Sequence, residues 1–202
     1  MIILLGGTCY GKDTIAKELQ SNHFQYQRIL ELSTREQREG EKNGKDYWFN
    51  STSNFLEKYK NGELAGVMKF ERVENNEVHE VYYGTRVKDI MTCPNESVIT
   101  TNAGAARKLK EFMQLHNKPV FVVLLSVKEE EQLRRLRLRG DEEAEIQKRM
   151  KTDKKALEDA MTFADIVVDN SYASPGCIAT EIVYAYNKFI SNGPSAEASV
   201  LS

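Results

Sequence analysis

The stretch from residue 35 to 49 carries the side chains best suited to holding a phosphate group. Arg35 and Arg38 lie three positions apart, Glu41 follows them, and Tyr47 comes near the end of the stretch. An arginine guanidinium is a planar fork of donors that fits two phosphate oxygens at once. A tyrosine hydroxyl adds a neutral donor. These side chains together could bind and orient a monophosphate.

A second phosphate site is predicted at the start of the chain. An apolar strand that ends in glycine, followed by a loop and then Gly-Lys at the start of a helix, is the context of a P-loop. In such a loop the backbone amides and the helix N-terminus face phosphate oxygens. The residues expected to bind ATP here are Gly6, Gly7, Thr8, Cys9, Tyr10, Gly11, Lys12, Asp13 and Thr14.

Lys12 is the residue of this loop that would reach the transferred phosphate. The strict P-loop pattern has Ser or Thr directly after the lysine, whereas this chain has Asp13 there and Thr14 next. Both side chains offer hard oxygen ligands, so both are candidates for Mg²⁺. Two phosphate sites in one small chain predict transfer of a phosphoryl group between them.

Alternating strands and helices must position these two sites. Apolar runs predict strands at 2–5, 25–30, 97–101, 119–127 and 166–168. Helical periodicity predicts helices at 12–21, 51–61, 85–91, 104–115, 129–139, 142–163 and 178–190. Two further strand-like segments, 64–73 and 77–83, predict a hairpin around Asn75-Asn76. The alternation indicates a parallel sheet flanked by helices, the α/β class of P-loop NTPases.

The expected organisation is a single domain from residue 1 to 192 with an insertion. Residues 1–31 and 88–192 would form the core, with an arginine-containing lid near 138–150. The β-rich stretch 32–87 would be a small acceptor-binding subdomain over the carboxyl ends of the strands, where open α/β sheets bind ligands. The last ten residues, 193–202, are expected to form a disordered tail.

Composition excludes several classes of function. The chain has 202 residues and a net charge of −2, so general affinity for nucleic acid is not expected. No apolar run reaches the length of a membrane span, and the apolar start is too short for a signal peptide. Cys9, Cys93 and Cys177 are far apart, which is typical of reduced thiols in a cytoplasmic protein.

The combination of these motifs resembles the guanylate kinase family over roughly residues 1–190. The resemblance is sharpest at Thr34-Arg35, Arg38, Gly40-Glu41, Asn43-Gly44-Lys45-Asp46-Tyr47, Phe49 and Tyr82-Tyr83-Gly84-Thr85. It implies that Arg35, Arg38, Tyr47 and Tyr83 hold the acceptor monophosphate, with Glu41 beside them. Thr85 stands where the family has a serine and keeps its hydroxyl.

The donor side is also similar to that family. Leu138-Arg139-Gly140 and Gln147-Lys148-Arg149 resemble its lid, which implies that Arg139 and Arg149 close over the ATP phosphates and stabilise the transition state. Arg135 is a further candidate contact on the donor side. The implied partners are Mg²⁺ with ATP and a nucleoside monophosphate, and the protein would be a monomer or homodimer.

The chain departs from the family where the acceptor base would be recognised. Glu31 stands in place of a serine, and Gly66-Val67 in place of a glutamate followed by tryptophan. Where the family has aspartates after the middle strand, this chain has Ile99, Thr100, Thr101 and Asn102, with no acid. Glu31, Glu63 and Glu71 are the candidates to supply the missing contact, because loss of a polar contact tuned to one base costs specificity.

The sequence is therefore compatible with three functions. The first is ATP-dependent phosphorylation of a nucleoside monophosphate, with GMP or dGMP as the default acceptor. The second is a kinase of the same fold for another phosphorylated acceptor such as ribose 1,5-bisphosphate, whose members share Gly-Lys-Asp-Thr but are less similar at 43–47. The third is a non-catalytic domain that binds phosphopeptides; such domains typically degrade the P-loop, whereas this chain keeps Gly11 and Lys12.

Overall fold

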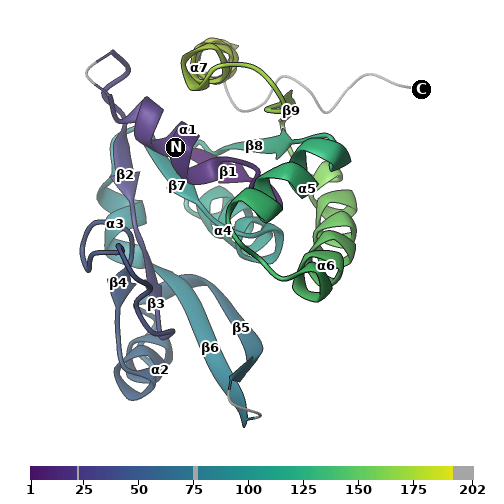
Figure 1. The fold of residues 1–202 in the computed structure, drawn as a ribbon. Helices are drawn as coiled ribbons and strands as arrows, with labels where there is room; N and C mark the ends of the chain where they lie inside the picture. The colour runs from purple at the N-terminus through teal and green to yellow at the C-terminus, as the bar shows by residue number, and fades with distance from the viewer. Residues whose placement is uncertain (22, 75–76, 193–202) are drawn as a thin grey trace.

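The computed structural model describes residues 1–21, 23–74 and 77–192 of the chain (Figure 1). The predicted tail at 193–202 and the turn at Asn75-Asn76 lie outside the described residues. Among the residues described, no helix is long and apolar enough to cross a membrane.

The main sheet has five strands in the order β2-β7-β1-β8-β9, and every pair in it is parallel. The prediction of a parallel sheet is therefore confirmed. The strands are β1 (Ile2–Leu5), β2 (Gln27–Ile29), β7 (Ser97–Thr100), β8 (Phe121–Ser126) and β9 (Ile166–Asp169). Because β1 and β7 are parallel neighbours, the segments that follow them both start at the carboxyl end of the sheet.

Helices cover both faces of this sheet, and β1 shows how the sequence divides them. Ile2 and Leu4 pack on one face with α1 (Lys12–Leu19) and α7 (Pro175–Asn192). Ile3 and Leu5 pack on the other face with α4 (Ala103–Leu115) and α6 (Glu143–Met161). All four of these strand residues are buried, as expected for a central strand covered on both sides. The helix α5 (Glu129–Leu138) precedes α6, and both lie on the side of the molecule away from the second sheet (Figure 1).

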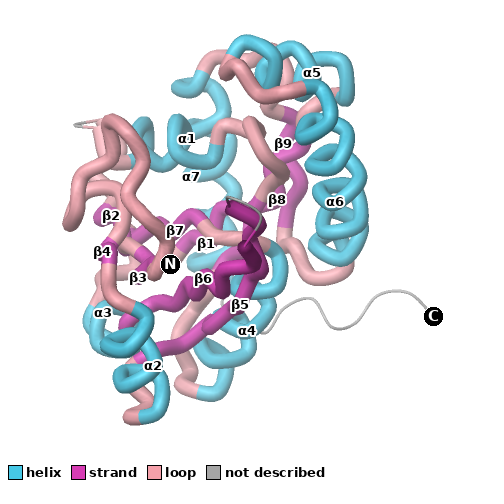
Figure 2. The backbone as a smooth tube through the Cα atoms, turned by 60° about the horizontal axis from the view of Figure 1, so that its bottom comes forward, coloured by secondary structure: helices cyan, strands magenta, loops and turns pink. Residues whose placement is uncertain are grey.

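A second sheet, in the order β4-β3-β6-β5, extends from the core. Its strands are β3 (Glu31–Ser33), β4 (Trp48–Phe49), β5 (Leu64–Glu74) and β6 (Glu77–Arg86), and the helices α2 (Thr52–Lys60) and α3 (Val87–Thr92) accompany it. Figure 2 shows the long β5–β6 hairpin running beside α4.

The predicted elements differ from the structure at the junction of the two sheets. The single strand expected at 25–30 is two strands, because the chain leaves the main sheet after Ile29 and joins the second sheet at Glu31. The helix expected from 85 begins at Val87, since β6 continues to Arg86. The short strands β3 and β4 were not predicted, because their pairing depends on distant partners such as Gly84 opposite Leu32.

Candidate active site

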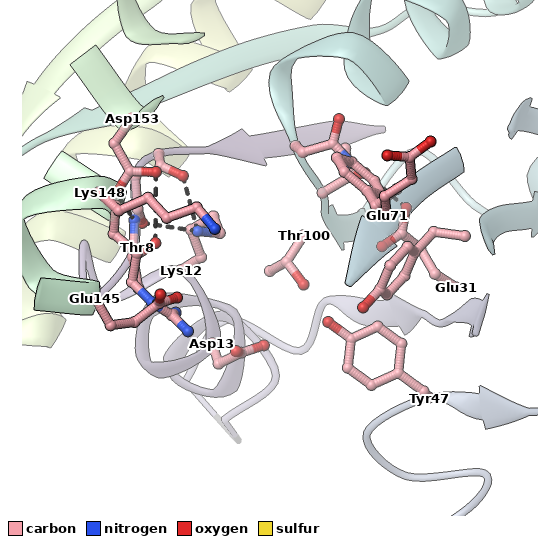
Figure 3. A pocket seen from close by; sticks show the side chains of 17 residues that line it. Thr8, Lys12, Asp13, Glu31, Tyr47, Glu71, Thr100, Glu145, Lys148 and Asp153 are labelled. Carbon is pink, nitrogen blue, oxygen red and sulfur yellow. Dashed lines mark hydrogen bonds and ion pairs between the residues drawn. The ribbon is translucent and has the colours of Figure 1, made fainter. Parts of the chain in front are cut away.

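One cavity of about 670 Å³ joins the carboxyl ends of β1 and β7 to the second sheet and to α6. Figure 3 shows Thr8, Lys12 and Asp153 on one side of it, Glu31, Glu71 and Tyr47 on the other, and Thr100 between them. The full lining is Gly6, Gly7, Thr8, Lys12, Asp13, Glu31, Tyr47, Phe70, Glu71, Tyr83, Thr100, Thr101, Asn102, Glu145, Lys148, Arg149 and Asp153. The structure thus brings the phosphate loop and two members of the predicted acceptor site, Tyr47 and Tyr83, to one space.

The loop from Gly6 to Gly11 is shaped by its last glycine. Gly11 has φ of +84°, and a Cβ there would lie 2.5 Å from Nδ2 of Asn170. The Asn170 side chain instead donates to the carbonyl of Tyr10 at 2.8 Å. Only glycine fits this combination of left-handed backbone and close approach, and it allows α1 to begin directly at Lys12 with its first amides unpaired within the helix.

The Lys12 side chain lies inside this loop. Its Nζ donates to the carbonyl oxygens of Gly6 at 2.8 Å and of Gly7 at 2.9 Å. Burial lowers the pKa of the Lys12 ammonium below its usual value, although nearby carboxylates oppose this shift. The ammonium is therefore held at the mouth of the phosphate loop.

Asp153 of α6 is a residue of the cavity that the sequence did not reveal. Its Oδ2 accepts from the backbone N–H of Thr8 at 2.6 Å and from Nε2 of Gln132 at 3.0 Å. Glu145, Arg149 and Asp153 are four residues apart and so share one face of α6. That spacing is the signal that could have indicated an acidic and basic helix face over the phosphate loop.

The two predicted lid arginines are placed differently. Arg149 lines the cavity and pairs with Glu145 at 2.8 Å. Arg139 is not among the lining residues, and its Nε donates to Asp141 at 2.8 Å. Both charges act on the Cys9 thiol, whose pKa is nevertheless raised because burial disfavours the thiolate.

Arg135, the further donor-side candidate, contacts the phosphate loop directly. Its Nη1 donates to the carbonyl of Cys9 at 3.3 Å, and its Nη2 donates to the carbonyl of Asn170 at 2.8 Å. Glu131 accepts from its Nε at 2.7 Å. Arg135 also lines a second cavity of about 660 Å³, formed with Glu130, Glu131, Arg134, Ser171, Tyr172 and Ala173.

On the acceptor side, Tyr47 and Tyr83 line the cavity with their ring centroids 6.2 Å apart. Burial raises the pKa of the Tyr47 hydroxyl, which keeps it a neutral donor. The Arg35 guanidinium lies 4.9 Å from the Tyr47 ring centroid and is paired with both carboxylate oxygens of Glu41, at 2.6 and 2.5 Å. Arg35 and Glu41 therefore support Tyr47 from behind rather than lining the cavity.

Arg38 and Thr85 complete the acceptor prediction. Arg38 is exposed, and its backbone N–H donates to Oε2 of Glu41 at 2.9 Å. Thr85 is fully buried in β6 opposite Glu31 of β3. Neither side chain is among those that line the cavity.

Of the three glutamates considered for recognition of the base, two lie in the cavity. Glu31 is 5% exposed and accepts a hydrogen bond from Oγ1 of Thr101 at 2.6 Å. Burial raises the pKa of the Glu31 carboxyl to about 7, against the opposing effect of that hydrogen bond. Glu71 lines the same space. Glu63 was a wrong candidate, because it lines a separate cavity. Its Oε2 lies 3.6 Å from Nζ of Lys58.

Gly66 occupies a position where no larger side chain fits. It has φ of +63° at an irregularity in the β5–β6 pairing, and a Cβ there would lie 2.7 Å from Cγ of Leu109 on α4. A glutamate at this position would therefore collide with the core. The departure from the family pattern at Gly66 has a packing cause.

Asp13 and Thr14 are the ligands of Mg²⁺ that the sequence predicts. Asp13 lines the cavity, its side chain is 62% exposed, and it pairs with Nη2 of Arg28 at 2.5 Å. Within residues 1–21, 23–74 and 77–192, no group of three or more His, Cys, Asp or Glu forms a metal cage. Mg²⁺ commonly takes one or two protein oxygens and completes its shell with substrate phosphates and water, so Asp13 fits it. Thr14 is exposed and is not among the residues that line the cavity.

Comparison with known proteins identifies the family. A family model described as Guanylate kinase matches residues 1–175. The chain is 31% identical to a guanylate kinase of Bifidobacterium longum over 84% of this chain and 85% of that protein. It is 27% identical to one of Syntrophus aciditrophicus over 93% of this chain and 86% of that protein.

The fold is also that of a solved structure. The crystal structure of guanylate kinase from Anaplasma phagocytophilum matches with a TM-score of 0.64 and 21% identity, over 93% of this chain and 84% of the other. The match in fold agrees with the match in sequence. The chain belongs to the guanylate kinase family.

Proposed function

We propose that this protein transfers the γ-phosphoryl group of ATP to GMP or dGMP. The observation that carries the proposal is the single cavity that joins the P-loop lysine, Lys12, to the acceptor-side tyrosines, Tyr47 and Tyr83. The relatives to which the chain is similar are named guanylate kinases. The stretch 32–87 then binds the acceptor, and the segment 138–150 closes over the donor.

ATP binds with its phosphates on residues 6–14. The loop amides and the start of α1 donate to phosphate oxygens, and the Lys12 ammonium moves from the loop carbonyls onto the transferred phosphate. The adenosine lies toward the second cavity, where Arg135 joins the loop to Ser171. Asp13 holds Mg²⁺, which supplies positive charge to the phosphates when bound.

The acceptor phosphate is held by Tyr47 and Tyr83, which line the cavity, and by Arg35 and Arg38 once their side chains turn toward it. A phosphate dianion is already a nucleophile, so no general base is needed and catalysis rests on positioning and charge stabilisation. Arg149, which lines the cavity, and Arg139, whose charge reaches Cys9, neutralise the charge of the transferring group. Closure of the segment 138–150 over the donor excludes water from the reaction.

The reaction takes place in the cytoplasm under this proposal. Cys9, Cys93 and Cys177 are free thiols, as a reducing compartment would leave them. ATP, the donor, is supplied there as well. The alternatives, a ribose 1,5-bisphosphate kinase and a phosphopeptide-binding domain, are not favoured by the named relatives.

A coupled assay of ADP release tests the proposal. The purified protein is given ATP with Mg²⁺ and each of GMP, dGMP, AMP, CMP, UMP, dTMP and ribose 1,5-bisphosphate. We expect turnover with GMP and dGMP. Turnover with ribose 1,5-bisphosphate alone would replace the proposed acceptor, and absence of ATP binding would instead support the phosphopeptide-binding alternative.

A further inference from the structure

The charged residues that line the acceptor end of the cavity are both carboxylates, whereas the donor end carries charges of both signs. Glu31 of β3 and Glu71 of β5 lie together on this side in Figure 3, while Lys12 and Lys148 lie on the other side together with Asp13, Glu145 and Asp153. Two carboxylates repel a phosphate but accept hydrogen bonds from neutral N–H groups. This end therefore suits the base of the acceptor rather than its phosphate.

The Glu31 carboxyl is built into the wall at a fixed position. It is 5% exposed, and Thr101 holds its Oε1 with a 2.6 Å hydrogen bond. Thr101 follows β7 directly and is itself 4% exposed. Since Thr101 engages Oε1, Oε2 is the oxygen left to accept from a ligand in the cavity.

Thr85 adds an independent sign of unmet hydrogen-bonding capacity beside Glu31. Its Oγ1 is buried and has no hydrogen-bond partner among the described residues. Thr85 is directly opposite Glu31 in the antiparallel pair of β3 and β6, so the two side chains share one face of the second sheet. Buried hydroxyls are normally paired, so Thr85 leaves one unmet hydrogen-bonding group next to Glu31, behind the wall of the cavity.

The missing contact cannot come from the position of Gly66. The left-handed backbone and the close approach to Leu109 exclude a longer side chain there. Glu31 and Glu71 are the carboxylates that line the cavity from the acceptor sheet.

Resting on the proposed function, we propose that Glu31 is the residue that determines base specificity, with Oε2 accepting from the N–H groups at the Watson–Crick edge of guanine. Guanine presents N1–H and the N2 amino group as adjacent donors on this edge. Adenine has an acceptor at N1, which would face the carboxylate unfavourably. Glu71 is a second acceptor for the same edge, and Thr101 is the positioning residue that fixes the Glu31 carboxyl.

The test uses Glu31→Gln, which keeps the size of the side chain and replaces an acceptor oxygen by a donor. Equilibrium binding of GMP without ATP, measured by titration calorimetry, is expected to weaken about tenfold to a hundredfold, the loss of one charge-assisted hydrogen bond. The preference for GMP over AMP should fall in parallel, while the KM for ATP stays unchanged. Glu63→Gln, a carboxylate of the same region outside the cavity, is the matched control and should change neither.

The contact between Glu31 and the base is located by a double-mutant-type cycle of binding affinities. The cycle combines Glu31→Gln with 1-methyl-GMP, a ligand that lacks N1–H. If Glu31 accepts from N1–H, the methyl group costs affinity in the wild-type protein but much less in Glu31→Gln, because the two changes remove the same bond. Should Glu31→Gln fail to fold, Glu31→Asp gives the same cycle with a carboxylate withdrawn by one methylene.

The outcomes separate the inference from the proposed function. A wild-type protein that neither binds nor phosphorylates GMP overturns both. A wild-type protein that phosphorylates GMP, together with a Glu31 variant that keeps full GMP affinity and discrimination, overturns the role of Glu31 alone. Additive effects in the cycle would place the N1–H contact on another residue.

Discussion

At the scale of single residues, Lys12 is the group on which the donor half of the cavity depends. Lys12→Met removes the ammonium but keeps the length of the side chain, and we expect kcat to fall by at least about a hundredfold. Lys17→Met, an exposed lysine on the same helix, is the control and should be near wild type. Near-normal turnover of Lys12→Met in the ADP-release assay would contradict the assignment of the P-loop.

The residues of the cavity were predictable in proportion to how local their motifs are. Lys12 and its loop form one contiguous pattern, and Tyr47 follows Arg35 at a fixed spacing, so both could be identified from the chain alone. Asp153 could not, because its role depends on how α6 packs over the loop. The restriction at Gly66 depends on Leu109, which lies far along the chain.

At the scale of elements, α6 places the Asp153 carboxylate against the backbone N–H of Thr8. A phosphate group of ATP would accept from the same N–H. Asp153→Asn removes that negative charge, and we expect the KM for ATP to fall about threefold to tenfold, the equivalent of roughly 1 kcal/mol. Asp159→Asn, on the same helix but paired with Arg107, is the control. An unchanged or higher KM for ATP in Asp153→Asn would mean that the carboxylate mainly holds α6 in place.

The packing of β5 on α4 predicts that alanine destabilises the protein more at Gly66 than at Gly62. Gly66→Ala combines positive φ with a clash against Leu109, and we expect it to lower the free energy of unfolding by about 2–4 kcal/mol. Gly62 also has positive φ, but nothing lies within 4 Å of its Cβ position, so Gly62→Ala measures the backbone cost alone. Equal losses in urea denaturation would show that the contact with Leu109 is unimportant.

The long elements followed from periodicity, and the short ones did not. The helix α4 and the strand β8 have enough apolar residues in register to be recognised from the chain, and α6 is a long charged segment without glycine or proline. The strands β3 and β4 have three and two residues, which is too few for any period to show. They exist because distant segments of the chain pair with them.

At the scale of the whole molecule, buried Glu31 links stability to pH. The pKa of its carboxyl rises from 4.5 to about 7 on folding through burial, and Asp13 adds to the shift while Thr101, Lys12 and Arg28 oppose it. The folded state therefore holds a proton that the unfolded state has lost between these values. The contribution of this proton to the free energy of unfolding is complete below pH 4.5 and is lost as the pH rises through about 7.

The free energy of unfolding should reflect this link. From pH 5 to 8 the wild-type protein should lose roughly 2.5 kcal/mol more stability than Glu31→Gln, which has no carboxyl to titrate. Urea denaturation of both proteins at several pH values measures the difference in their free energies of unfolding. The titration of all other groups is common to both proteins and cancels in this difference. Parallel curves for the two proteins would show that Glu31 keeps an ordinary pKa in the fold.

The close contact at Gly66 also bears on how the cavity can open. Leu109 packs against Gly66, and Nζ of Lys108 donates to the carbonyl of Val67 at 2.7 Å, so β5 is fastened to α4 and through it to the main sheet. The opposite wall meets the phosphate loop through side chains, such as Asp153 on the amide of Thr8. The β5 wall of the cavity is therefore tied to the main sheet at two points, and the contact that must rearrange when a phosphate binds at the Thr8 amide is the one that crosses to Asp153 of α6.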